Sequence, residues 1–115
     1  MHEVSICESM LDIIKEHAEK EGAARVTAVK LKIGELSGVV EDSMRFAFEV
    51  VTKGTVADGA RLVIENVPLT ERCKSCGKTF RIVGYAFSCK HCESPEIEVV
   101  SGRELLIEDI DMEDG

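Results

Sequence analysis

Two pairs of cysteines constrain the fold of this chain more than any other feature of its 115 residues. Two residues separate Cys73 from Cys76, two separate Cys89 from Cys92, and twelve lie between the pairs. Two thiolates at this spacing can reach one ion, and two such pairs supply the four sulfur ligands of a closed tetrahedral zinc site. We therefore expect a zinc-ribbon-like module over residues 69–96, whose metal is structural because no coordination position stays open.

Several features around the cysteine pairs leave alternatives open. A rubredoxin-like iron site is one, although such carriers wrap their iron in aromatic residues and only Phe80, Tyr85 and Phe87 are available here. His91 lies inside the second pair, where it either replaces a thiolate or faces solvent as an ordinary loop residue. Five basic residues between 72 and 92 either balance the charge of a four-thiolate zinc centre or contact nucleic acid: Arg72, Lys74, Lys78, Arg81 and Lys90.

Composition excludes several classes of protein. A hydrophobic content of 44% suffices for one modest core, and a net charge of −8 opposes attraction of the whole protein to nucleic acid or to an anionic membrane. No apolar run approaches the roughly 20 residues of a membrane span, and no secretory signal is visible. We expect a cytoplasmic protein, in which cysteines stay reduced and bind metal rather than form disulfides.

Helical periodicity predicts two helices outside the cysteine module. The first runs from about residue 5 to 20, with Ser5 and Glu8 as a capping box and Gly22 just past its end. The second runs from about residue 41 to 52. Their apolar stripes are Ile6, Met10, Ile13, Ile14 and Ala18 in the first helix, and Met44, Ala47, Phe48 and Val51 in the second. We expect Cys7 to pack in the core and His17 to be solvated.

Alternating apolar residues predict strands over 25–33 and 60–67, and shorter extended segments over 97–100 and 105–107. The acidic tail after residue 104 is expected to fray towards its end. The two short segments cannot fold alone, so the chain should return after the cysteine module to add a strand. The sequence thus predicts an α+β fold in two parts: an α/β domain over 1–68 with 97–115, and an inserted zinc module over 69–96.

The N-terminus combines several nitrogen donors within one short arc. A residue as large as His2 should block removal of Met1, so the chain would carry the amine of Met1, the backbone nitrogens of His2 and Glu3, and one imidazole. Nitrogen donors in a square array suit Ni(II) or Cu(II). A disordered terminus is the alternative. Glu41 and Asp42 are carboxylates that either approach this site or lie at a solvated helix start.

Four stretches occur in an order that resembles the HypA family of hydrogenase maturation nickel metallochaperones. They are Met1-His2-Glu3-Val4-Ser5-Ile6, the run from Lys32 to Val39, Phe46-Ala47-Phe48-Glu49, and the two cysteine pairs. The resemblance covers essentially the whole chain. One departure is Lys90, since family members often have proline directly after the third cysteine.

The resemblance implies a carrier rather than an enzyme, with two helices on a mixed three-stranded sheet plus a zinc module. Its nickel ligands would be the amine and backbone at Met1, His2, and the backbone at Glu3. Its structural zinc would be held by Cys73, Cys76, Cys89 and Cys92. Nickel would pass to the large subunit of [NiFe]-hydrogenase, in some organisms also towards urease and its maturation proteins, with a HypB-type GTPase as partner.

These expectations leave some questions open. The competing interpretation is a zinc-ribbon module that binds nucleic acid or acts as an adaptor, whereas nickel delivery requires neither nucleic acid nor a membrane. A small enzyme is disfavoured because no nucleophile, base and oxyanion set is visible. The oligomeric state, monomer or homodimer, is not decided by the sequence.

Overall fold

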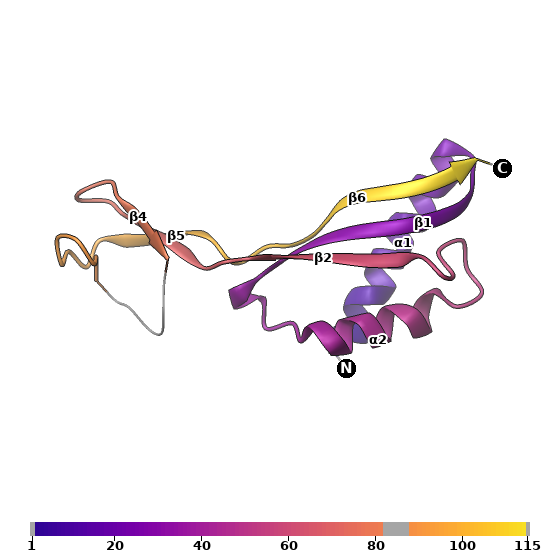
Figure 1. Ribbon diagram of the computed structural model, residues 1–115, viewed down its shortest axis with the longest axis horizontal. Helices are drawn as coiled ribbons and strands as arrows, with labels where there is room; N and C mark the ends of the chain where they lie inside the picture. The colour runs from indigo at the N-terminus through magenta and orange to yellow at the C-terminus, as the bar shows by residue number, and fades with distance from the viewer. Residues whose placement is uncertain (1, 82–87, 115) are drawn as a thin grey trace. The chain divides into compact units, whose positions relative to one another are not determined.

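The computed structural model describes residues 2–81 and 88–114, which form two compact units, each with its own three-stranded sheet (Figure 1). The first unit comprises residues 1–32, 39–65 and 106–115, and the second comprises 33–38 and 66–105. Each unit has a separate set of buried side chains. The two-part organisation inferred from the cysteine spacing has its counterpart in these units, although their bounds differ from the expected ones.

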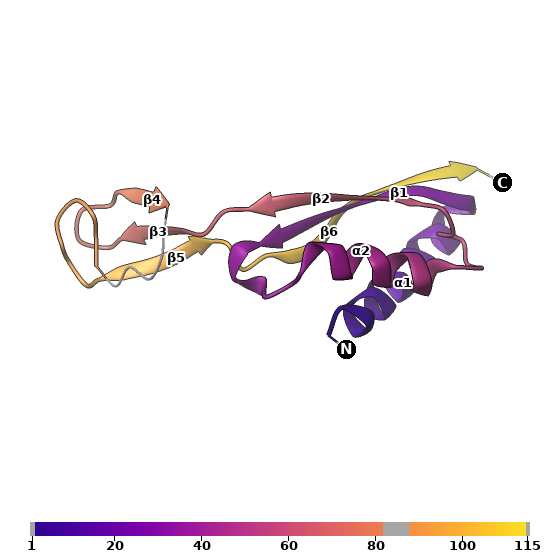
Figure 2. The same cartoon turned by 60° about the horizontal axis from the view of Figure 1, so that its bottom comes forward.

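The sheet of the first unit has the order β2-β1-β6, with β1 (Ala23–Gly34) between β2 (Arg61–Val67) and β6 (Leu105–Asp114). Figure 2 shows β1 and β2 running in the same direction, which a helical crossover between two strands permits. Arg25 pairs with Glu113, and the Thr27 hydroxyl donates to the backbone oxygen of Asp111, so β6 runs antiparallel to β1. The sheet is therefore mixed, as the resemblance implied.

Two helices lie on one face of this sheet: α1 (His2–Glu21) and α2 (Glu41–Thr52) (Figure 2). Met44 of α2 is fully buried, as are Ile14 of α1 and Val29 and Leu31 of β1. Within the described ranges, no helix combines the length and the apolar character that crossing a bilayer requires. The predicted bounds of the second helix are confirmed at both ends.

The first helix begins three residues earlier than predicted. Ser5 lies inside α1 rather than at its start, so the capping-box prediction is wrong. The end is as expected, because Gly22 has a φ of 64° and stops the helix in a left-handed conformation. One member of the predicted apolar stripe, Ile13, is 45% exposed.

The opposite face of the sheet carries a network of charges across three strands. Lys30 Nζ lies 3.3 Å from a Glu65 oxygen and 3.6 Å from a Glu108 oxygen, and Lys32 Nζ lies 3.8 and 3.7 Å from the same two carboxylates. A hydrogen bond to Glu65 is the main reason that the pKa of Lys30 is raised. The predicted alternation of buried apolar and outward basic residues along β1 is confirmed.

The prediction of a fraying tail is wrong. β6 continues to Asp114, because it is hydrogen-bonded to β1 in the sheet and because Arg25 and Thr27 of β1 bind Glu113 and Asp111 near its end. The acidic residues on this strand do not prevent pairing, since Arg25 and Lys30 of β1 meet two of them. Acidic side chains on an edge strand also discourage pairing with other chains.

The second unit holds the antiparallel sheet β4-β3-β5, formed by β3 (Thr70–Cys73), β4 (Thr79–Arg81) and β5 (Ile97–Ser101). Within residues 66–81 and 88–105, Cys73, Phe80 and Cys89 form a buried cluster, with Leu69 and Ile97 packed against them. We expected all of 97–115 to join the first domain. Instead, β5 pairs with β3, which groups residues 97–105 with the cysteines.

The second unit also takes in residues 33–38, which include a short 3₁₀ helix, η1 (Glu35–Ser37). One Glu35 oxygen accepts from the backbone N–H of Leu69 at 3.0 Å and from Arg81 at 3.2 Å. The backbones of Gly34 and Gly102 approach so closely that a Cβ on Gly34 would lie 2.1 Å from the Gly102 oxygen. This segment is therefore packed against the cysteine-bearing part of the chain.

Candidate metal centres

The four predicted zinc ligands converge on one point. The sulfur atoms of Cys73, Cys76, Cys89 and Cys92 all lie within 4.8 Å of one another. Across the two pairs, Cys73 Sγ lies 3.5 Å from Cys92 Sγ and Cys76 Sγ lies 3.7 Å from Cys89 Sγ. Four thiols this close surround a space that suits a metal bound by four sulfur ligands.

Each cysteine pair lies on a turn in which backbone N–H groups point at the sulfur of the first cysteine. The first turn joins β3 to β4, and the backbone N–H of Cys76 points at Cys73 Sγ, 3.4 Å away. In the second turn, the N–H groups of His91 and Cys92 point at Cys89 Sγ, at 3.3 and 3.4 Å. Backbone N–H groups aimed at sulfur stabilise the thiolate that a metal requires.

Each turn ends on a residue in the left-handed conformation. Gly77 has a φ of 77°, and its N–H donates to the Cys73 oxygen at 2.8 Å. Glu93 occupies the matching place in the second turn, with a φ of 62° and a 2.9 Å bond to the Cys89 oxygen. This match between the two turns is hard to see in the sequence, because only one of the two positions is a glycine.

The environment shifts the pKa values of Cys73, Cys89 and Cys92 in different directions. The N–H of Cys76 lowers the pKa of Cys73 to about 6. Burial opposes ionisation of Cys89, but the N–H groups of Cys92 and His91 outweigh it and lower that pKa. The Ser94 N–H favours the thiolate of Cys92, yet its pKa rises to about 12 because the neighbouring sulfur of Cys73 and burial favour the thiol.

His91 does not join the sulfur cluster among the described residues. Its side chain is exposed, and its ring meets the ring of Phe80 edge to face with centroids 6.1 Å apart. The loop interpretation of this histidine fits these contacts. Of the aromatic residues considered for a rubredoxin-like site, Tyr85 lies outside the described residues, as does Phe87.

Two of the five basic residues of the cysteine module are engaged by carboxylates within the chain. Arg72 forms an ion pair with Glu98, and Arg81 pairs with Glu35. The second unit as a whole contains six Lys or Arg and six Asp or Glu. A nucleic-acid interface needs a net positive surface, so this charge balance disfavours the nucleic-acid interpretation.

At the N-terminus, the structure places the backbone of two predicted nickel ligands, His2 and Glu3, at the start of a helix. Met1 lies outside the described residues, and so does the side chain of His2. α1 begins at His2, and Glu3 supplies the acid of its first turn. The first four N–H groups of a helix have no acceptor within it, so the backbone nitrogens here are not held by helical hydrogen bonds. The positive end of the helix dipole disfavours a bound cation, and the negative charge of Glu3 offsets this effect.

The structure settles the surroundings of three further residues from the sequence analysis. Cys7 is fully buried, with its sulfur 3.3 Å from Met44 Sδ, and burial raises its pKa to about 11. This confirms its place in the core. His17 is exposed on α1, as expected. Asp42 lines a groove of about 490 Å³ that Val4 of α1 also lines, two residues from His2.

Comparison with known proteins finds one family over almost the whole chain. Residues 1–112 match the family described as "Hydrogenase/urease nickel incorporation, metallochaperone, hypA". The chain belongs to the HypA family. The hydrogenase maturation factor HypA of Geobacter metallireducens is 47% identical over 113 residues, which are 98% of this chain and 100% of that protein. The HypA of Chlorobaculum parvum is 41% identical with the same coverage of both chains.

Solved HypA structures share the fold. The solution structure of the nickel metallochaperone HypA from Helicobacter pylori has a TM-score of 0.69 at 26% identity, covering 98% of both chains. Another solution structure of a HypA protein has a TM-score of 0.76 at 28% identity, covering 97% of this chain and 96% of the other. The chain is thus a nickel-incorporation metallochaperone for hydrogenase, with a four-cysteine cluster that is able to hold a metal.

Membership in the HypA family gives weight to residues that the sequence analysis treated as an ordinary turn. Gly34 and Glu35 belong to the stretch on which the resemblance was based, yet no contact was predicted for them. Gly34 has no side chain and so allows the backbone of Gly102 to approach closely. The Glu35 carboxylate accepts hydrogen bonds from Leu69 and Arg81. The sequence does show a glycine followed by an acidic residue after a buried strand. It does not show their partners, because these residues lie far along the chain.

Proposed function

We propose that this protein binds Ni(II) at its N-terminus and delivers it to the precursor of a [NiFe]-hydrogenase. The ligands are the amine of Met1, the imidazole of His2 and the backbone nitrogens of His2 and Glu3. Membership of the HypA family supports nickel as the cargo. The observation that carries the site itself is the start of α1 at His2, which leaves these backbone nitrogens without helical partners.

Such a site can release its ion in steps. Its donors lie at the end of the chain, so a recipient can displace them one at a time. Amine and imidazole bind nickel only when deprotonated, and their ordinary pKa values are about 7.7 to 8.0 and 6.5, so affinity falls in mild acid. Glu3 keeps a negative charge beside the cation.

The second metal in this proposal is a structural Zn(II) held by the four-cysteine cluster. The converging sulfurs and the N–H groups directed at them suit a closed site of this kind. Few of the described residues of the second unit form its apolar core, so we expect this unit to depend on the metal to fold. The two metals would then have separate roles, one as cargo and one as part of the fold.

The proposal also includes the protein partners. They are a HypB-type GTPase and the hydrogenase large subunit, and urease maturation proteins where the organism has urease. A cytoplasmic location belongs to the proposal, since reduced thiols are needed for the four-cysteine site.

Nickel titration of the untagged protein beside a His2→Ala variant tests the proposal. His17→Ala is the matched control, because His17 is an exposed histidine on the same helix. We expect His2→Ala to abolish stoichiometric nickel binding and His17→Ala to leave it unchanged, with zinc content equal in all three. Undiminished nickel binding by His2→Ala would disprove the terminal site.

A further inference from the structure

A pair of serine hydroxyls joins the two cysteine turns. Ser75 lies between the cysteines of the first turn, and Ser94 lies two residues after Cys92. Their Oγ atoms are 2.8 Å apart and hydrogen-bonded, and the N–H of Glu96 donates to Ser94 Oγ at 3.1 Å. This hydroxyl pair contains no cysteine, so it connects the two turns independently of a metal.

The same two serines lie against cysteine sulfurs through their backbones. The N–H of Cys76 is the main cause that lowers the pKa of Cys73 to about 6, and the N–H of Ser75 adds to the same shift. The Ser94 N–H favours the thiolate of Cys92, although the sulfur of Cys73 and burial raise that pKa to about 12. Cys73 and Cys92 are cysteines whose sulfurs meet across the two turns, 3.5 Å apart. The hydroxyl pair therefore joins two residues that each direct an N–H group at one of these sulfurs.

We propose that Ser75 and Ser94 are positioning residues, whose hydroxyl pair retains the metal in the four-cysteine cluster. This inference rests on the proposed function, in which that metal is a structural zinc that stays bound while nickel is exchanged. Each turn carries two of the four sulfurs, so loss of zinc requires the sulfurs of one turn to separate from those of the other. The hydroxyl pair opposes this separation and fixes the direction of two N–H groups. Groups that orient metal ligands in this way commonly change metal affinity by about tenfold or more.

Transfer of zinc from the full untagged protein to a coloured chelator tests the hydroxyl pair. Ser75→Ala and Ser94→Ala should each speed zinc release by about threefold to tenfold, the change expected from one hydrogen bond. Both variants should still fold, because the bond from the Lys74 N–H to the Glu96 oxygen, at 2.7 Å, joins two backbones and remains. Ser75→Thr and Ser94→Thr keep a hydroxyl and should release zinc at a rate close to that of the parent.

Two further measurements separate positioning of the ligands from a general loss of stability. The double variant, with Ser75 and Ser94 both replaced by alanine, should release zinc no faster than either single variant, because the two hydroxyls form one bond. In protein loaded with cobalt(II), each single variant should shift the charge-transfer bands between sulfur and metal. This shift is expected because the N–H groups directed at the sulfurs change their orientation.

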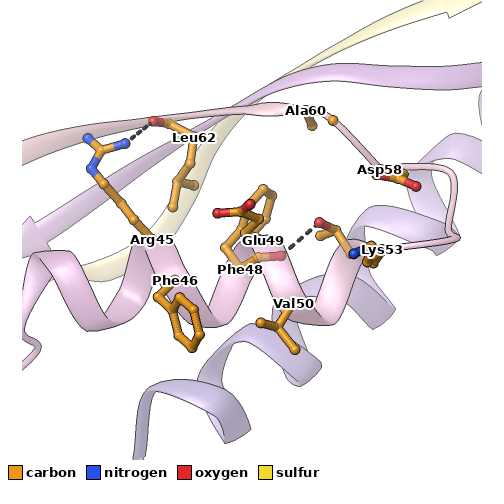
Figure 3. Close-up of a pocket in the computed structure, with 11 residues that line it drawn as sticks. Arg45, Phe46, Phe48, Glu49, Val50, Lys53, Asp58, Ala60 and Leu62 are labelled. Atoms are coloured by element: carbon orange, nitrogen blue, oxygen red, sulfur yellow. Dashed lines mark hydrogen bonds between the residues drawn. The ribbon is translucent and has the colours of Figure 1, made fainter.

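Bonds elsewhere in the chain provide two matched controls. Ser101 forms another hydroxyl pair in the second unit, 2.5 Å from Thr70, at the opposite end of β3 from Cys73. In the first unit, the Arg45 guanidinium binds the Leu62 oxygen at 2.6 Å and connects α2 to β2 (Figure 3). Ser101→Ala and Arg45→Met should lower the stability of their own units and leave zinc release and the cobalt bands unchanged.

The positioning proposal is overturned if Ser75→Ala and Ser94→Ala release zinc at the rate of the parent, or if Ser101→Ala speeds release as much as they do. Additive effects in the double variant would also overturn it, because the two hydroxyls would then act separately. These outcomes leave the proposed function intact. A parent protein that contains no zinc and gives no cobalt spectrum typical of four sulfur ligands would instead refute the four-cysteine metal site, and this proposal with it.

Discussion

Cys73 Sγ lies 3.5 Å from Cys92 Sγ, so the first and last cysteines of the module meet although 18 residues separate them in sequence. The contact joins the β3–β4 turn to the loop before β5. A metal in this cluster would therefore connect two segments whose described residues share a cluster of three buried side chains, Cys73, Phe80 and Cys89.

Replacing Cys73 by serine should remove the metal and unfold the second unit. Structural zinc sites of this type contribute about 10 to 16 kcal/mol, more than a core of this size can replace. Metal analysis should show loss of zinc, and amide NMR signals from residues 66–105 should collapse towards random-coil values. The first unit should keep its dispersed signals.

Cys7→Ala provides the converse control for the cysteine replacement. Cys7 is buried against Met44 in the first unit and lies outside the sulfur cluster. Its loss should lower the free energy of unfolding of that unit by about 1 to 2 kcal/mol and leave the zinc content unchanged. Loss of zinc in Cys7→Ala would mean that the two units do not have separate roles.

Cys7 also predicts a dependence of stability on alkaline pH. Burial, and secondarily the charge of Glu3, raise the pKa of Cys7 from 9.0 to about 11 in the folded chain. The unfolded chain therefore loses this proton first as the pH rises. The contribution is fully present below pH 9 and is lost as the pH passes through 11. Urea unfolding should show a loss of up to about 2 kcal/mol between these values.

The same titration of Cys7→Ala isolates this effect. Other groups, including Lys30, also titrate above pH 10, but they are present in both proteins. The difference between parent and variant should shrink towards zero by pH 11. A difference that stays constant from pH 8 to 11 would contradict the assignment to Cys7.

Substitutions at the two left-handed residues that end the cysteine turns, Gly77 and Glu93, should change the stability of the second unit in opposite directions. Glu93→Gly should stabilise the second unit by about 1 kcal/mol, because it relieves a φ of 62° that side chains rarely adopt. Gly77→Ala, at a φ of 77°, should destabilise it by a similar amount. Resistance to a zinc chelator measures both. Equal resistance in the two variants would mean that the turns do not limit the stability of the module.

Gly34→Ala should strongly destabilise the protein. The backbone at Gly34 is extended, with φ −80° and ψ 151°, so the penalty is steric rather than conformational. The new Cβ would lie 2.1 Å from the Gly102 oxygen, and separating the two backbones should cost about 3 kcal/mol.

Gly22→Ala is the control, since it has a φ of 64° but no atom within 4 Å of the new Cβ. It should cost only about 1 kcal/mol. Thermal unfolding of both variants makes the comparison. Equal losses of stability in the two variants would show that the backbones of Gly34 and Gly102 can move apart without an energetic penalty.

Local patterns in the sequence predicted the elements whose causes are local. The apolar spacing in residues 41–52 gave the correct bounds of α2, and the alternation around Lys30 and Lys32 gave the two faces of β1. The cysteine spacing likewise predicted the sulfur cluster, because each turn is formed by four or five adjacent residues.

The predictions were wrong where contacts between residues distant in sequence determine the structure. The acidic tail is ordered as β6 because Arg25 meets Glu113 on the neighbouring strand, a pairing that no local pattern shows. β5 belongs to the cysteine unit because its partner is β3. The start of α1 was placed at Ser5 by a capping motif, but the helix continues to His2. The role of Gly34 depends on Gly102, which lies far along the chain.

The central claim is that the amine of Met1 binds nickel together with His2. It is tested most directly by nickel titration of the untagged protein beside one that carries a single additional glycine before Met1. This extension moves the amine and converts the Met1 nitrogen to an amide while leaving every side chain in place. We predict stoichiometric nickel binding by the untagged protein, no such binding by the extended one, and equal zinc in both. Nickel binding of equal affinity in the two proteins would contradict the claim.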